Sequence, residues 1–435
     1  MLGDDKSTKG DLMSHIYPSS VRAWVTLAVL VVGVLLAYVD RQILSLLVDP
    51  IRSDLGLSDT QIGVLQGPAF ALFYAFAALP LGLMIDRYNR RNILIVGVLV
   101  WSVATAACGL AGDFWSLFAA RVGVAVGEAC LIPGVLSLLG DAFSPRRKPT
   151  AFAVYMVLVL VGSSLAIAAS GAVIDAITTG GVHIGSISAP WRVAFLCVAI
   201  PGPAVAIAFA TLREPQRTGV VGGVSTETLD RDRIIILAWL VPGLACASVA
   251  FQLTLAWFPT VLVRDYGLSG GQAGRLLGLS IALASLAVGL VAAFAPRLLK
   301  SRLRPMLLWA AAGLLVGAPL LLLTHNIRPD TAVLGATLAA APALLAYCLA
   351  PTLIQAIAPN RYWGRTTALF KLIESIMIAL AAVAVGVGSD RLGQGGLATA
   401  LTAALVLSLG LGALALLRAR GQLARVPALA DRSAG

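Results

Sequence analysis

The chain has 435 residues, of which 59% are hydrophobic and only 12% are charged, and its mean hydropathy is +0.90. Soluble domains carry about twice that charged fraction, roughly 25%. The composition therefore excludes an ordinary soluble enzyme, which would have to bury more apolar surface than one core can hold. The formal net charge is +11. In a soluble protein such a charge suggests nucleic-acid binding, whereas in a membrane protein it first indicates how the chain is oriented.

Twelve segments are apolar and long enough to cross a bilayer, which needs about 20 residues per helix. They are 23–48, 61–85, 93–111, 114–139, 150–176, 191–211, 234–260, 272–296, 305–324, 331–356, 366–388 and 395–418. A polar connector at 213–233 divides them into two sets of six. We therefore predict an all-α membrane protein with one six-helix bundle at 23–212 and another at 234–418. Tails at 1–22 and 419–435 flank the bundles.

The basic residues predict the orientation. Of the 32 Lys and Arg residues, 23 lie in the two tails and in alternate loops, six lie on the opposite side and three lie within spans. Under the positive-inside rule, this asymmetry places both termini in the cytoplasm. Topology, with some attraction to anionic membrane lipids, thus accounts for the net charge. We expect no nucleic-acid partner.

Cysteine and histidine positions argue against an enzyme or a metal site. The five cysteines lie singly within apolar runs, and the three histidines lie outside those runs. Neither set has the spacing of a zinc site or of a disulfide framework. The spans also supply no nucleophile with an adjacent base. We therefore expect no enzymatic activity and no bound metal or other cofactor.

Ionisable side chains inside a span cost roughly 2.5–3.5 kcal/mol each, so each one requires a reason. Asp40 and Arg41 lie in the first span, and Arg121 and Glu128 lie in the fourth. A guanidinium stays charged and offers a planar fork to phosphate or carboxylate, so Arg41 and Arg121 are the predicted substrate headgroup ligands. A carboxylate in an apolar chamber can exchange a proton, so Asp40 and Glu128 are the predicted proton-coupling residues. A neutralised network that only holds the helices together is the alternative.

The coupling hypothesis is that protonation of Asp40 frees the neighbouring Arg41 to bind the substrate. The other ionisable residues near helix ends have structural interpretations. Lys371 and Glu374 are three residues apart on the eleventh span and are expected to pair with each other. Two further carboxylates at predicted helix ends need only solvation to explain them. They are Asp175 and Asp390.

Several motifs lie where a known family has them. The run GLMIDRYNRR at 82–91 follows the second span and resembles the signature that the major facilitator superfamily carries between helices two and three. RVGVAVGE at 121–128 resembles the helix-four motif of the same superfamily. Within it, the segment 38–75, GEA at 127–129 and SDRLG at 389–393 are similar to the spinster branch.

The resemblance implies two bundles that rock about a central cavity lined by helices 1, 4, 7 and 10. For the spinster branch it implies export of lysophospholipids or sphingosine phosphate, often linked to protons. It also implies a latch in which Asp86 docks on the start of helix eleven, near Thr366, and stabilises the outward-open state. The residues assigned to this gating latch are Gly82, Asp86, Arg87, Arg90 and Arg91.

The scarcity of neutral polar side chains in the spans points to the substrate. The four asparagines all lie outside the spans. A sugar site needs many neutral hydrogen-bond partners, whereas an apolar cavity with a few charges suits an anionic amphiphile. We therefore predict a monomeric, proton-coupled secondary transporter of a lysophospholipid-like or sphingosine-phosphate-like lipid in the inner membrane of a bacterium, driven by the proton gradient. The alternatives are a proton-coupled carrier of small organic anions and, more distantly, a receptor or scaffold that does not transport.

Overall fold

Long helices account for nearly all of the chain that the computed structural model describes. The described residues are 18–182, 184–185, 187–217, 229–298, 303–322, 328–359 and 362–426. Most of the predicted tails and the middle of the predicted connector thus lie outside the described residues. Within the described residues, β-pairing is limited to one isolated antiparallel bridge between Ile184 and Ile187. The predicted all-α class is confirmed.

Twelve apolar helical stretches match the twelve predicted spans. Eleven of them, within the described residues, are long and apolar enough to cross a membrane, and α14 (Leu303–Leu322) occupies the place of the ninth predicted span. Besides α14, eight of the spans are single, uninterrupted helices. They are α2 (Ser20–Leu46), α6 (Arg90–Leu110), α9 (Lys148–Gly180), α12 (Arg231–Tyr266), α13 (Gly270–Leu298), α15 (Pro329–Ile357), α16 (Trp363–Leu392) and α17 (Gly396–Leu423).

Three spans are interrupted. They consist of α4 (Asp59–Gln66), the π-helix η1 (Pro68–Leu72) and α5 (Phe73–Arg87); of α7 (Phe114–Glu128) and α8 (Leu131–Ala142); and of α10 (Pro190–Ala199) and α11 (Pro201–Thr211). Proline lies at or near each break, because it cannot donate the backbone hydrogen bond that a continuous helix needs. Pro68 opens η1, and Pro201 opens α11. A short helix, α3 (Val48–Leu55), follows α2.

Local sequence fixes where several helices begin. Ser58 caps α4, and its hydroxyl and the Gln61 side chain form a reciprocal capping box. Asp113 caps α7 in the same way with Ser116. The backbone N–H of Ser116 donates to the Asp113 carboxylate, and this hydrogen bond lowers the pKa of that carboxyl below its ordinary value. At the other end of a span, Gly267 stops α12 in the left-handed conformation that glycine adopts most readily.

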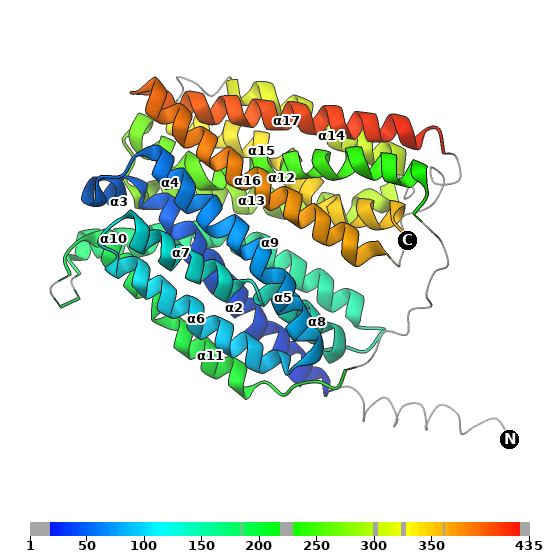
Figure 1. Cartoon of the computed structure of the whole chain (residues 1–435), viewed down its shortest axis with the longest axis horizontal. Helices are drawn as coiled ribbons and strands as arrows, with labels where there is room; N and C mark the ends of the chain where they lie inside the picture. The colour runs from blue at the N-terminus through cyan, green and yellow to red at the C-terminus, as the bar shows by residue number, and fades with distance from the viewer. Residues whose placement is uncertain are drawn as a thin grey trace.

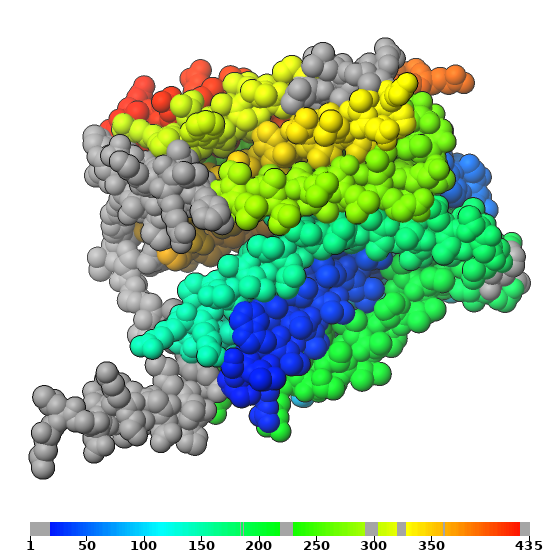
Figure 2. All heavy atoms as spheres, turned by 180° about the vertical axis from the view of Figure 1, so that it is seen from behind, coloured from blue at the N-terminus to red at the C-terminus, as the bar shows by residue number. Residues whose placement is uncertain are grey.

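The helices form two halves, α2 to α11 and α12 to α17, which lie one below the other in Figure 1. The halves meet where α4 and η1 pack on α16 and where α9 packs on α13, and Figure 2 shows α9 and α13 side by side. Small residues allow this approach: a side chain at Gly67 would place its Cβ 2.8 Å from the carbonyl oxygen of Ala379. We call the end of the molecule that contains α3 the α3 end, at the left of Figure 1. We call the opposite end, where α5 ends and α6 begins, the latch end.

Candidate functional site

Four charged side chains from α2 and α7 meet inside the N-terminal half. Asp40 and Glu128 are each 1% exposed, and Arg121 is 2% exposed. Arg41 Nη2 donates to Glu128 Oε2 at 2.7 Å, and Arg121 Nη1 lies 3.9 Å from Asp40 Oδ1. The structure thus brings together all four residues that the sequence selected for substrate and proton binding.

The pairing is crosswise, and this corrects the coupling hypothesis. That hypothesis gave Asp40 and Arg41 one shared charge. Adjacent residues on a helix point about 100° apart, so they contact different partners on α7. Arg41 pairs with Glu128, whereas Asp40 pairs with Arg121. The arginine that pairs with Asp40 is therefore Arg121 and not its chain neighbour Arg41.

Several polar atoms of this network are buried without a hydrogen-bond partner among the described residues. They are Asp40 Oδ1, Arg41 Nε, Arg121 Nε, Arg121 Nη1 and Glu128 Oε1. Leaving a buried donor or acceptor unsatisfied costs about 1–3 kcal/mol. Structural networks normally satisfy such atoms. The spare donors of both arginines therefore favour an anion-binding interpretation over a purely structural one.

Aromatic rings surround the two guanidinium groups. Arg41 lies 4.5 Å from the ring centroid of Phe70, 5.4 Å from that of Tyr38 and 5.5 Å from that of Tyr74. Arg121 lies 5.2 Å from the Phe70 centroid. Phe70 is in η1, and a π-helical turn at a break in a span often marks a functional site. The irregular turn here places one ring against both arginines, where cation–π attraction supports them.

A second charged cluster lies in the C-terminal half. Lys371 Nζ on α16 donates to Glu374 Oε2 at 2.7 Å, so the predicted pair is confirmed, and it also donates to the Tyr347 hydroxyl at 3.2 Å. The Lys371 side chain is half exposed. Tyr38 in the other half lies within electrostatic reach of both Lys371 and Arg41. One cation from each half therefore lies near the same tyrosine.

At the α3 end, an arginine on α12 holds the two halves together. Arg264 Nη1 and Nη2 donate to the two carboxylate oxygens of Asp59 at 2.7 and 2.8 Å, and Nε donates to Asp49 at 2.8 Å. The Ser389 hydroxyl on α16 donates to Asp59 at 2.6 Å. Asp59 is 3% exposed. These contacts keep α3 and α4 against the C-terminal half.

Asp390 and Asp175 complete the closure of this end, which corrects the prediction that solvation explains them. The backbone N–H groups of Asp59 and Thr60 donate to the Asp390 carboxylate at 3.0 and 2.8 Å. Asp390 thus caps the positive N-terminal end of α4 from the opposite half. Asp175 on α9 forms an ion pair with Arg275 on α13. Sequence reasoning missed both contacts because their partners are far away along the chain.

The latch end has a different arrangement. Asp86 and Arg87 are exposed, and the Asp86 carboxylate has no hydrogen-bond partner among the described residues. The predicted contact of Asp86 with the start of α16 is therefore not made in this conformation. A Cβ at Gly82 would meet nothing within 4 Å. Among the described residues, these features indicate that the two halves are apart at the latch end, whereas they are joined at the α3 end.

The two remaining latch residues act within the N-terminal half. Arg90 is fully buried, and its guanidinium pairs with Asp141 and with Glu214, the latter at 2.6 Å. The backbone N–H of Arg91 donates to the other oxygen of Glu214 at 3.1 Å. Arg90 and Arg91 thus tie the start of α6 to the segment that follows α11. These contacts of Arg90 and Arg91 all lie within the N-terminal half, which also carries Asp86, and none of them reaches the C-terminal half.

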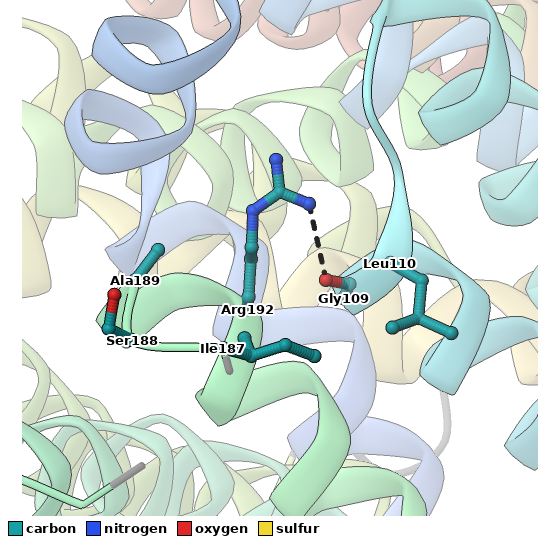
Figure 3. A pocket seen from close by; sticks show the side chains of 6 residues that line it. All are labelled: Gly109, Leu110, Ile187, Ser188, Ala189 and Arg192. Carbon is teal, nitrogen blue, oxygen red and sulfur yellow. Dashed lines mark hydrogen bonds between the residues drawn. The ribbon is translucent and has the colours of Figure 1, made fainter. Parts of the chain in front are cut away.

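A cavity of about 350 Å³ lies between the end of α6 and the start of α10, lined by residues 109–110, 187–189 and 192 (Figure 3). Arg192 occupies its wall, and its guanidinium donates to the carbonyl groups of Gly109 and Ala111 and to Asp54. Those donors are already used within the N-terminal half. The cavity contains none of the predicted site residues, so we assign it no part in substrate binding.

Comparison with known proteins identifies the family. The model of the Major Facilitator Superfamily matches residues 30–382. The chain belongs to this superfamily. It is 29% identical over 392 residues to an MFS-type efflux pump of Mycolicibacterium smegmatis, covering 89% of each chain. It is 30% identical over 243 residues to the hexuronate transporter of Bacillus subtilis, covering 53% of this chain and 54% of the relative.

The resemblance to the spinster branch is also confirmed. The chain is 28% identical over 257 residues to protein spinster homolog 3 of Danio rerio, covering 57% of this chain and 49% of the relative. The fold matches the crystal structure of a bacterial homologue of the human lysosomal transporter Spinster in an inward-facing, unoccupied conformation. The TM-score is 0.74 at 24% identity, with 95% of this chain and 98% of the other covered. The chain is therefore a member of a superfamily of membrane transporters, and it is similar to spinster proteins in sequence and in fold.

Proposed function

We propose that this transporter couples proton movement to the transport of an anionic amphiphile, a lysophospholipid or a sphingosine-phosphate-like lipid, by alternating access. Asp40 and Glu128 exchange protons, and Arg41 and Arg121 bind the anionic headgroup. No cofactor takes part, and the proton gradient is the driving force. The protein works as a monomer.

The observation that carries this proposal is the buried set of two acid–arginine pairs with unused donors. Arg121 is 2% exposed, yet its Nε and Nη1 have no hydrogen-bond partner among the described residues. A phosphate or carboxylate group would accept from such donors in bidentate geometry. The positive charge of Arg121 can be neutralised either by the charged Asp40 carboxylate or by the bound anion. The two therefore compete for Arg121. Protonation of Asp40 therefore favours anion binding, and Glu128 and Arg41 are related in the same way.

The apolar surroundings of the two arginines are the reason for proposing a substrate with a hydrocarbon tail. The arginines lie against Phe70 and among helices with few neutral polar side chains. Such surroundings solvate hydrocarbon better than a polyhydroxylated solute. The similarity to spinster proteins supports the same choice, because resemblance to the spinster branch implies a lipid substrate.

A small organic anion is the second candidate. Its support is the similarity to a hexuronate transporter and the presence of two tyrosines near Arg41, Tyr38 and Tyr74, whose hydroxyl groups could bond to a hydroxylated acid. The same two arginines would bind its carboxylate. A non-transporting receptor is disfavoured, because a receptor needs neither proton-binding carboxylates nor a latch.

The charge asymmetry supports a topology in which both termini and the latch end face the cytoplasm of a bacterial inner membrane. In that topology, the conformation with a joined α3 end is open to the cytoplasm. Movement to the outward-open state would break the contacts of Arg264 and Asp390 and would allow Asp86 to dock near Thr366.

The test is a flux assay in liposomes with an imposed pH gradient, using a lysophospholipid, glucuronate and glucose. We expect lysophospholipid transport that depends on the pH gradient, and we expect Asp40→Asn to abolish that dependence. Asp113→Asn, which changes an exposed carboxylate outside the spans, is the matched control. Transport of glucuronate without lysophospholipid would select the second candidate. Lysophospholipid transport that remains proton-coupled in Asp40→Asn would contradict the assigned role of Asp40.

A further inference from the structure

A threonine that the sequence did not select contacts the key carboxylate of the site. Thr105 lies on α6 and is fully buried, and its hydroxyl donates to Asp40 Oδ2. Several buried hydroxyls bond to the backbone of their own turn instead. Ser102, one turn earlier on α6, donates to the carbonyl of Val98 at 2.7 Å. The hydroxyl of Thr105 is thus directed across the helix boundary to α2.

The groups that face Asp40 from each neighbouring element are few. Arg121 and Glu128 face it from α7, and Arg41 adjoins it on α2. On α6, Cys108 lies within electrostatic reach of Asp40 and is fully buried. Thr105 adds the one hydrogen bond to Asp40 from a side chain among the described residues. Arg121, at 3.9 Å, lies beyond hydrogen-bond distance.

A hydroxyl is suited to both protonation states of a carboxyl group. It donates to the carboxylate, and after a rotation about its C–O bond it accepts from the carboxylic acid. The bond to the charged form is stronger than the bond to the neutral form. The hydroxyl therefore keeps the Asp40 side chain in one place while favouring release of its proton.

We propose that Thr105 is the positioning residue for proton exchange at Asp40, setting the pH at which the carboxyl group takes up and releases its proton. This inference rests on the proposed proton coupling. It assigns a part in proton exchange to a residue outside the two acid–arginine pairs, on α6, which carries no charged side chain near the site. Its hydroxyl makes proton release compatible with a carboxylate that is 1% exposed.

The expected direction follows from the removal of that donor. In Thr105→Val the shape is kept, but the charged form of Asp40 loses a stronger hydrogen bond than the neutral form does. Asp40 then retains its proton to higher pH. Hydrogen bonds to charged groups exceed neutral ones by an amount that corresponds to roughly a tenfold change in proton affinity, or about one pH unit.

Infrared titration of the purified, lipid-reconstituted protein measures this directly. The C=O stretching band of protonated carboxyl groups is followed against pH, and the component that disappears in Asp40→Asn is assigned to Asp40. We expect Thr105→Val to raise the midpoint of that component by about one pH unit and to move the band to higher frequency. Thr105→Ser should restore both. Ser102→Ala, which removes a hydroxyl already bonded within α6, should leave both unchanged.

The outcomes separate the inference from the proposed function. An unchanged midpoint in Thr105→Val overturns the role of Thr105, even where lysophospholipid flux remains proton-coupled. A shifted midpoint with pH-independent flux of both lysophospholipid and glucuronate overturns the proposed coupling and leaves the role of Thr105 in place. A band with no component sensitive to Asp40→Asn overturns both.

Discussion

Replacing Arg264 by Gln removes the guanidinium that links the two halves at the α3 end. In the observed conformation this group makes two hydrogen bonds to Asp59 and one to Asp49. All three join α12 to helices of the other half. They must break when the α3 end opens, so the replacement changes the balance between conformations as well as the stability of the fold.

The size of the effect follows from burial. Breaking a fully buried ion pair costs roughly 3–5 kcal/mol. The Arg264 side chain is 21% exposed and that of Asp49 is 30% exposed, which weakens the interaction, whereas the Asp59 side chain is only 4% exposed. Asp59 also keeps the hydrogen bond from Ser389. We therefore expect a loss of about 2 kcal/mol for the closed α3 end, which changes the ratio of the two conformations by roughly 30-fold.

Electron–electron distance measurements between two spin labels report this ratio. Labels at Ser53 and Gln394, which are exposed at the α3 end of opposite halves, would be introduced in a background without the native cysteines. We expect Arg264→Gln to increase the population with the longer distance. Arg192→Gln is the matched control, because Arg192 is also 21% exposed and pairs with an aspartate, Asp54, of its own half. Identical distance distributions for Arg264→Gln and the parent would show that the Arg264 guanidinium does not hold the α3 end closed.

Three further changes test the two ends and the N-terminal half. Gly82→Leu is compatible with the observed conformation at its first added atom, because a Cβ at this position would meet nothing within 4 Å. It should block closure of the latch end, so labels across that end should keep the longer distance when substrate is added. Gly67→Val should open the α3 end, because its Cβ would lie 2.8 Å from the Ala379 carbonyl oxygen. A cysteine introduced at this end by Gln394→Cys should then become more accessible to a polar thiol reagent. Arg90→Leu removes a buried guanidinium that pairs with two partly buried carboxylates, so thermal unfolding should show a loss of roughly 3 kcal/mol, whereas Arg91→Leu should cost clearly less.

Much of the candidate site could be predicted from the sequence. Charged residues are costly in a bilayer, so Asp40, Arg41, Arg121 and Glu128 stand out from an apolar background without any structure. The spacing of Arg121 and Glu128, about two helical turns, also places both on one face of their span. Both residues indeed pair with α2.

Thr105 could not be predicted in this way. A hydroxyl in an apolar span usually bonds to its own helix, as that of Ser102 does. A hydroxyl also costs little to place in the membrane, so the sequence does not single it out as a charged residue is singled out. Its role depends on the rotation of α6 about its axis relative to α2, which the sequence pattern does not encode. The same applies to Phe70, whose position against both arginines depends on the π-helical turn.

Sequence patterns are enough to predict the membrane spans, the all-α class, the family and the small set of charged residues within the spans. These follow from local quantities: segment length, apolar content and the cost of burying charge. The tertiary structure alone decided that Arg41 pairs with Glu128 and Asp40 with Arg121, and that Arg264 and Asp390 join the halves at the α3 end. Those contacts link residues as far apart as 331 positions in the chain, and they depend on how the helices rotate and on which end of the two halves is closed.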